Sequence, residues 1–488
     1  MRPLSKMNLD TFYGFRQPFS FVMVILCALT QVWICESVVK NFLPAPEYDS
    51  ADYVTVAYNM AKYNVSSISK LDSANVTPDI AREPVTGLLL SLPMRVMEVG
   101  NLECLLAQQV DTCKEQLRWV TRINTIQVVF ITIGVFIAVF KLTSSYLLSN
   151  AAVLLISSSV LLPSFVKVFS SEIPAANFLL WHSILLWGAF FSKHRRVCAT
   201  GSGILLLALI LTKAVYVYWM YLLCVCLILS WIYKSRINKS ITFTLLLIVT
   251  PAFIGIGGWM ARNYYYLDRL TLTDRANSVI AIRTNYTKIS WEQYSSGYLY
   301  FIPYYGPEIA KKYFGDIPEN TYDDNKPGWV EKHMLPAFPP NFQSLSESDI
   351  LLHFGQAMLQ NLDKHLALIP LFIYRGMFVG PCCTVEGNYI MDPPFVSRPI
   401  QLFWLAQKLI TALLGPIFFL SIFLIIRKKN WGLLLFFSPV LFNFLIHSAF
   451  TQFYSRFSIP VYPMMLIALF VCFDLYRQKN FNGIPSIP

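Results

Sequence analysis

Ten long apolar runs, separated by short polar breaks, constrain this 488-residue chain more than any other feature. A helical run of about 20 apolar residues matches the hydrocarbon thickness of a bilayer. Only 14% of the residues are charged, whereas soluble domains carry roughly 25%. The sequence therefore predicts an all-α polytopic membrane protein, a bundle of about ten transmembrane helices. The predicted spans cover residues 19–39, 122–141, 146–166, 174–192, 199–215, 216–233, 240–260, 399–426, 431–448 and 461–476.

The net charge of +11 is concentrated in the short polar breaks, for example at residues 193–196 and 427–429. Positively charged loops stay on the cytoplasmic side of a membrane, so these clusters need no nucleic-acid partner. With both ends of the chain inside, four segments are predicted on the outer side: the first loop, the turn at 167–172, the segment 262–398 and the loop 447–460.

Three parts follow from this pattern. Residues 1–261 form an N-terminal transmembrane module with a catalytic first loop at 40–100, and residues 399–488 form the C-terminal transmembrane helices. The polar segment 262–398 is long enough for an exoplasmic subdomain with a juxtamembrane helix. Two shorter apolar stretches, 85–97 and 366–381, are interpreted as helices lying at the outer interface.

Most of the ten cysteines lie inside apolar runs, where a thiol serves as a small apolar side chain. Cys104 and Cys113 lie in the first outer loop and are candidates for a disulfide in an oxidising compartment. Cys382-Cys383 is also predicted outside. His182 and His447 fall within or at the end of apolar runs, where packed, hydrogen-bonded roles are favoured over catalysis.

The first outer loop carries an unusual set of polar residues. Asp49, Asp52 and Tyr53 come soon after the first span, and Arg82 and Glu83 follow about thirty residues later. An ionisable group held beside hydrophobic segments usually has a partner or a task. This loop is therefore the predicted place for the chemistry of a membrane-embedded enzyme.

Four more charged residues are predicted at the same membrane surface, each next to a different span. They are Glu172, Lys213, Arg262 and Arg456. An alternative is that the two arginines are only membrane-edge anchors. A lysine inside an apolar stretch is harder to explain in that way, because burying its charge requires a partner.

Taken in order, these motifs resemble a known family. They are Asp49-x-x-x-Tyr53, Arg82-Glu83-Pro84, Ser171-Glu172, Leu211-Thr212-Lys213, Trp259-x-x-Arg262-Asn263-Tyr264 and Tyr454-Ser455-Arg456 with Pro460. The series resembles membrane glycosyltransferases of the GT-C class, in particular relatives of the lipid A aminoarabinose transferase and of the protein O-mannosyltransferases. Two departures stand out: Lys213 replaces a frequent Arg, and Val85-Thr86-Gly87 replaces a Gly-Tyr-Pro.

The resemblance implies a polyprenyl-phosphate-linked sugar donor and a lipid, glycan or protein acceptor. It implies an inverting transfer with Asp49 as general base; if the acceptor is a phosphate, Asp49 would orient it instead. The implied roles are catalytic for Asp49, Glu83 and Glu172, donor-phosphate binding for Lys213, Arg262 and Arg456, and supporting for Asp52, Tyr53 and Arg82.

The resemblance does not require a cofactor or metal, although a divalent Mg²⁺ or Mn²⁺ shared by Asp49 and Glu172 is an alternative. The implied location is the plasma (inner) membrane of a bacterium or the endoplasmic reticulum of a eukaryote, with the active site on the non-cytoplasmic face. A transporter or lipid flippase without transferase activity is the rival interpretation, and a catalytically silent scaffold is a second. Transporters place ionisable residues at mid-depth and are built from repeats, whereas here the charges gather at one surface.

Overall fold

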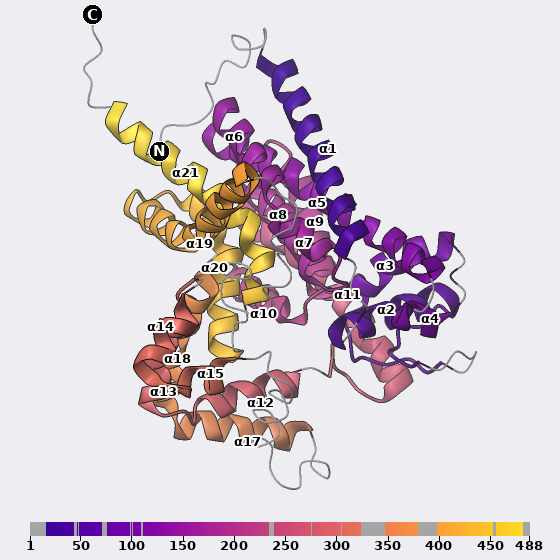
Figure 1. Cartoon of the computed structure of the whole chain (residues 1–488). Coiled ribbons are helices and arrows are strands. Elements are labelled where there is room, and N and C mark those ends of the chain that lie inside the picture. Colours follow the sequence, from indigo (N-terminus) through magenta and orange to yellow (C-terminus); the bar gives the residue numbers. More distant parts are fainter. Residues whose placement is uncertain are drawn as a thin grey trace, which may run out of the picture.

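The computed structural model describes residues 16–42, 46, 48–70, 76–97, 99, 101–108, 111–233, 239–274, 276–303, 305–323, 347–378, 398–451 and 455–481. Within these ranges the secondary structure is helical and contains no strand (Figure 1). In chain order the helices are α1 (Arg16–Phe42), α2 (Tyr48–Lys62), α3 (Pro84–Val96), α4 (Leu102–Ala107), α5 (Asp111–Thr143), α6 (Tyr146–Ser158), α7 (Leu161–Val166), α8 (Glu172–Phe191), α9 (Arg195–Ile210), η3 (Ala214–Tyr216), α10 (Val217–Ile232), α11 (Lys239–Leu267), α12 (Ala276–Tyr286), α13 (Trp291–Tyr300), α14 (Gly306–Phe314), α15 (Ile317–Tyr322), α17 (Glu347–Gln360), α18 (Leu362–Met377), α19 (Arg398–Arg427), α20 (Trp431–Phe450), η8 (Ser455–Val461) and α21 (Tyr462–Phe481).

Eight helical segments of the described chain are long and apolar enough to cross a membrane. They are α1, α5, α8, η3 with α10, α11, α19, α20, and η8 with α21. Each coincides with one of the ten predicted spans. The protein is therefore a multi-pass integral membrane protein, as the apolar runs predicted.

The predicted span 146–166 is divided into two shorter helices, α6 and α7. The backbone of Ser159 is extended, and its side chain accepts a hydrogen bond from the Leu161 amide at 3.3 Å. Pro163 explains the break, because a continuous helix would need a Pro163 N–H to bond the carbonyl four residues earlier. In the first turn of a new helix that missing donor is tolerated.

The predicted span 199–215 is also shorter than expected. Helix α9 covers only 16 residues and ends at Ile210, before the short 3₁₀ helix η3 begins at Ala214. Lys213 occupies the extended residue between them, with φ −143° and ψ 106°. The interruption thus places Lys213 in the short link between two helices.

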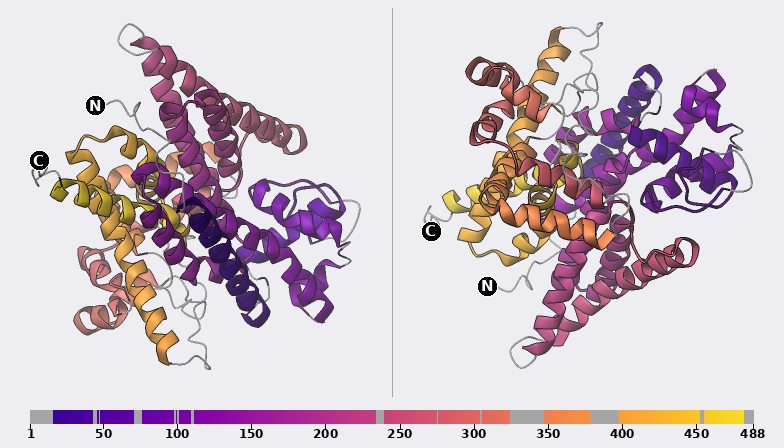
Figure 2. Two further views of the ribbon diagram at one scale, coloured as in Figure 1. Left: turned by 90° about the horizontal axis from the view of Figure 1, so that it is seen from above. Right: turned by 90° about the horizontal axis from the view of Figure 1, so that it is seen from below.

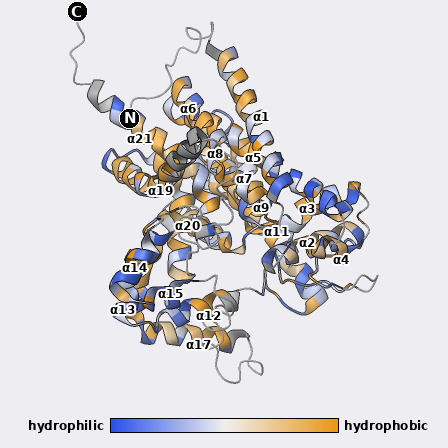
Figure 3. Cartoon of the chain, viewed as in Figure 1, coloured by the Kyte–Doolittle hydropathy of each residue, from blue (hydrophilic) through white to orange (hydrophobic). Residues whose placement is uncertain are grey.

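The bundle is held together by close helix contacts, and α8 packs against both α9 and α5. Helix α9 also packs on α11, where Gly203 lies directly against the backbone carbonyl of Ile248. Small residues allow such an approach between helix backbones in membranes. Apolar side chains face outward, as expected for a lipid-facing surface; Phe21 and Trp33 of α1 are about 70% exposed. Figure 3 shows the apolar colour concentrated on the bundle.

Two groups of shorter helices flank the bundle. Helices α2, α3 and α4 come from the first loop, and Cys104 and Cys113 form the expected disulfide beside them. Helices α12 to α18 come from the segment after α11. In both views of Figure 2 the purple first-loop helices and the salmon helices α13 to α15 lie on opposite sides of the bundle. Cys382-Cys383 lies outside the described residues.

The α9–α11 contact makes a prediction about stability. A Cβ added at Gly203 meets the Ile248 carbonyl oxygen, and overpacking of this kind costs about 1–3 kcal/mol. We expect Gly203→Ala to lower the midpoint of thermal unfolding in detergent. The matched control is Gly257→Ala on α11, where no described atom lies within 4 Å of an added Cβ. Equal midpoints for the two variants would show that the helices do not approach as closely as described.

Candidate active site

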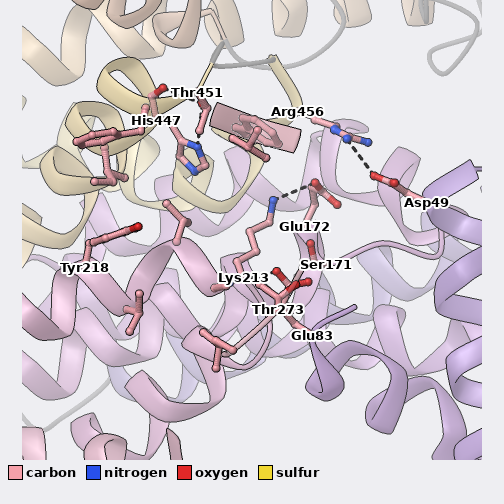
Figure 4. A pocket seen from close by; sticks show the side chains of 18 of the residues that line it. Asp49, Glu83, Ser171, Glu172, Lys213, Tyr218, Thr273, His447, Thr451 and Arg456 are labelled. Atoms are coloured by element: carbon pink, nitrogen blue, oxygen red, sulfur yellow. Dashed lines mark hydrogen bonds and ion pairs between the residues drawn. The ribbon is translucent and has the colours of Figure 1, made fainter. Parts of the chain in front are cut away.

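One cavity of about 290 Å³ gathers most of the residues that the sequence singled out (Figure 4). It is lined by Asp49 and Tyr53 of α2, by Glu83, by Ser170, Ser171 and Glu172, by Lys213, Ala214 and Val215, by Val217 and Tyr218 of α10, by Thr271, Leu272 and Thr273, by Val279 and Ile280 of α12, by Ile446, His447, Phe450 and Thr451, and by Arg456 and Phe457 of η8. Charged and apolar side chains therefore share one site, assembled from segments far apart in the sequence.

Asp49 lies in the first turn of α2, where the partial positive charge of a helix N-terminus stabilises a carboxylate. Its Oδ1 accepts a hydrogen bond from Arg82 Nη2 at 2.6 Å. Its Oδ2 accepts one from Arg456 Nη2 at 3.0 Å, although Arg456 follows 407 residues later. The two guanidinium groups favour the ionised form of Asp49, which is the form that can accept a proton.

Arg82 supports the first loop from behind the cavity wall. Its Nε and Nη2 donate to Asp52 Oδ2 at 3.0 and 2.6 Å, so it joins two carboxylates that lie one helical turn apart on α2. Burial opposes the charge of this guanidinium, but Asp49, Tyr53 and Asp52 outweigh that effect and raise the pKa of Arg82 above its ordinary value. Arg82 therefore stays charged and keeps the two aspartates in place.

Glu83 connects the first loop to the end of α9. Its Oε2 accepts a hydrogen bond from the Tyr53 hydroxyl at 3.3 Å, and its Oε1 accepts one from the Ala214 amide at 3.3 Å. Two residues after Glu83, the Val85 amide donates a hydrogen bond to the Leu211 carbonyl at 3.0 Å. Pro84 begins α3 at a position where a missing N–H is tolerated. Glu83 thus aligns Tyr53 with the residue that follows Lys213.

Glu172 and Lys213 form a second ion pair in the cavity, with Nζ and Oε1 3.1 Å apart. Both side chains are largely buried, with 11% of Lys213 and 5% of Glu172 exposed. The Lys213 ammonium also lies 4.9 Å from the centre of the Phe457 ring, within the range of a cation–π contact. A buried ammonium needs such partners, and here they come from α8 and η8.

Asp52 and Arg82 lie beside Asp49 without lining the cavity, and Arg262 is a third predicted site residue that the structure places elsewhere. It does not line the cavity. Its guanidinium donates to the backbone carbonyls of Asp79 at 3.2 Å and Ser66 at 3.5 Å. Tyr454, which belongs to the last motif, lies outside the described residues.

The cavity also contains residues to which sequence reasoning gave no role in the site. His447 is 5% exposed, lines the cavity and stacks on Phe457 with the ring centres 4.7 Å apart. Its position at the end of an apolar run was the available signal. His182, by contrast, lies within the bundle, where its Nδ1 lies 2.9 Å from the Ser202 carbonyl and its Nε2 accepts from Trp219 Nε1 at 3.0 Å.

Three carboxylates and two fixed cations line the cavity, which leaves one negative charge in excess. Behind the cavity wall, Arg82 pairs with both Asp49 and Asp52, so it does not change this balance. In the part of the chain that the structure describes, no group of three or more His, Cys, Asp or Glu side chains could hold a metal ion. Asp49 and Glu172 each face a cationic side chain instead.

No family model and no curated protein sequence matches the chain. Among solved structures it is similar to the archaeal oligosaccharyltransferase AglB from Archaeoglobus fulgidus in complex with an inhibitory peptide and a dolichol-phosphate. That match has a TM-score of 0.47 and 12% identity, and covers 97% of this chain and 53% of that one. The chain is also similar to ArnT from Cupriavidus metallidurans bound to undecaprenyl phosphate, with a TM-score of 0.35, 10% identity and coverage of 97% and 82%. Both neighbours are glycosyltransferases of the GT-C class, and this chain spans about half the length of the AglB structure.

The buried ion pair predicts an asymmetric response to mutation. Lys213→Met leaves Glu172 charged and unpaired in a buried position, which costs about 3–5 kcal/mol of unfolding free energy. We expect the double variant Lys213→Met with Glu172→Gln to recover most of that loss, as measured by unfolding in detergent. Arg269→Met is the control, because it removes a largely exposed pair with Asp274 that contributes about 1 kcal/mol or less. Additive effects of the two substitutions would contradict the pairing.

Proposed function

We propose that this protein is a membrane glycosyltransferase. It moves a sugar from a polyprenyl-phosphate-linked donor to a hydroxyl group of a lipid, glycan or protein acceptor on the non-cytoplasmic face. The observation that carries the proposal is the presence of the Asp49 carboxylate in the same cavity as two cations, Lys213 and Arg456. A proton acceptor and a site for a departing anion are the two elements that this reaction needs.

The transfer is a single displacement. The acceptor oxygen forms a bond to the anomeric carbon of the sugar while the bond from that carbon to the phosphate oxygen breaks. The electron pair of the broken bond stays on the phosphate, and the acceptor proton passes to Asp49. One attack from the face opposite the leaving group inverts the anomeric configuration.

Lys213 and Arg456 stabilise the phosphate as its negative charge increases. Fixed cations in a water-poor cavity act strongly on such charge, because they need no rearrangement at the moment of reaction. Lys213 is anchored by Glu172 and by the Phe457 ring, which holds its ammonium in the cavity. Arg456 reaches the same cavity from η8, and 38% of its side chain is exposed to an incoming ligand.

Arg456 also couples donor binding to the base. In the described structure it is paired with Asp49 at 3.0 Å. A bound phosphate competes with Asp49 for this guanidinium. When the phosphate takes it, Asp49 loses one of its two stabilising cations and becomes the stronger proton acceptor. The base is then fully effective only when the donor is present.

The apolar part of the cavity supports a lipid-linked donor. Val215, Val217, Ile446 and Phe450 line the cavity together with the charged residues. Tyr218 is 47% exposed and lies in Figure 4 on the side of the cavity away from Asp49. A donor with a charged phosphate and a hydrocarbon chain matches this combination of surfaces.

The base assignment is tested by Asp49→Asn. Removing a general base lowers the rate by about 10²–10⁴-fold, so we expect kcat for sugar transfer from a mixture of polyprenyl-phosphate sugars to fall by that factor. The wild-type product should have inverted anomeric configuration when examined by NMR.

Asp316→Asn serves as the matched control, because Asp316 is 69% exposed on a surface helix end and pairs only with Lys311 among the described residues. Equal transfer by Asp49→Asn and the wild type would remove the base role. Failure of the wild type to transfer any sugar, together with movement of the lipid donor across vesicles, would favour a flippase instead.

A further inference from the structure

The end of α11 contacts two separate loops through backbone carbonyls. Arg262 Nη1 donates to the Asp79 carbonyl at 3.2 Å and to the Asn263 side-chain oxygen at 2.9 Å. Nη2 donates to the Ser66 carbonyl at 3.5 Å, and the guanidinium lies 4.7 Å from the Trp259 ring centre. All three acceptors are neutral oxygens. The carbonyls of Asp79 and Ser66 belong to the first loop, so this arginine holds that loop to the end of α11.

The neighbouring side chains hold the second loop. Asn263 is fully buried, and its Nδ2 donates to the Thr271 carbonyl at 2.8 Å. The Trp259 indole N–H donates to the Leu272 carbonyl at 3.2 Å. Thr271 and Leu272 line the cavity, so these two bonds fix one of its walls.

The two loops also meet directly. The Asp274 amide donates to the Ile80 carbonyl at 3.3 Å. On the first-loop side, the Asp79 carboxylate accepts hydrogen bonds from the Ile68 amide at 2.5 Å and from the Ala81 amide at 3.1 Å. The backbone that Arg262 holds therefore continues directly into Arg82 and into Glu83, which lines the cavity.

We propose that Trp259, Arg262 and Asn263 form a clasp that positions two walls of the cavity, and that Arg262 acts through this clasp instead of binding the donor phosphate. The inference rests on the proposed function for the meaning of the cavity, and it revises the role that the family resemblance implied for Arg262. In this role Arg262 is a positioning residue, and Lys213 and Arg456 are the cations that contact the phosphate.

An arginine suits this task for a geometric reason. Its planar fork presents several donors in fixed directions and can bridge the carbonyls of Ser66 and Asp79 at once. A lysine has the same charge but a compact ammonium on a flexible stem. The two roles of Arg262 therefore predict different results for Arg262→Lys: a phosphate contact survives the change in part, whereas a bridge between carbonyls does not.

The experiment compares Arg262→Lys, Arg262→Met and Lys213→Met with wild type in lipid nanodiscs. Three quantities are measured: the Kd for undecaprenyl phosphate, kcat and KM for sugar transfer, and hydrogen–deuterium exchange of residues 76–83 and 271–274. Arg196→Met is the charge-matched control, because Arg196 is exposed and its guanidinium lies over the Phe243 ring, away from the cavity.

We expect both Arg262 variants to keep the Kd for undecaprenyl phosphate within about twofold and to lower kcat at least about tenfold, because displaced catalytic groups lose rate. Exchange should accelerate in both segments in the two Arg262 variants. Lys213→Met should raise the Kd about tenfold, the loss expected for one hydrogen bond to a charged group. Because it also lowers overall stability, it should accelerate exchange in these two segments no more than in the rest of the chain.

Two results would overturn the clasp. The first is a rise in Kd in Arg262→Met as large as that in Lys213→Met, with Arg262→Lys retaining affinity. The second is unchanged exchange in both segments in the Arg262 variants. A wild-type protein that binds no undecaprenyl phosphate and transfers no sugar would instead refute the proposed function, and the exchange data alone would then decide the clasp.

Discussion

Two ion pairs in one partly apolar cavity are the interaction on which the rest of this structure depends. Asp49 pairs with Arg456, and Glu172 pairs with Lys213. Each pair joins separate helical segments. The Glu172–Lys213 pair is costly to break because the charge left behind is buried, whereas Arg456 is 38% exposed and Asp49 keeps its second partner, Arg82. The positions of four helices are therefore constrained: α2, α8, η3 and η8 all begin at this cavity.

The interruption after α9 serves this convergence. Helix α9 ends three residues before Lys213. Glu83 then accepts a hydrogen bond from the amide that follows Lys213, which ties the first loop to the same break. A regular bundle of full-length spans would have placed the lysine in a helix and left its charge within the membrane. The broken helix ends provide backbone amides and room for side chains instead.

The sequence predicted the fold well where a single physical signal dominates. Apolar length identified the spans, and the positions of ionisable residues beside them identified Asp49, Glu172, Lys213 and Arg456 as members of one site.

The sequence was less informative where local breaks in a helix or tertiary contacts determine the structure. The interruption at Ser159 depends on Pro163 within a run that otherwise looks continuous. The placement of Arg262 depends on carbonyl groups of Ser66 and Asp79, which carry no side-chain signature, and His447 resembles any histidine at the end of an apolar helix. The segment 262–398 gave few motifs, and its short helices depend on contacts with α20 and with one another.

A cryo-electron microscopy structure with bound undecaprenyl phosphate is the most direct test of whether this cavity binds the donor phosphate. We predict that the phosphate lies within hydrogen-bond distance of Lys213 Nζ and the Arg456 guanidinium, that Arg456 has moved away from Asp49, and that Arg262 remains on its two carbonyls. A phosphate bound outside this cavity, with both ion pairs unchanged, would show that Lys213 and Arg456 do not bind the donor.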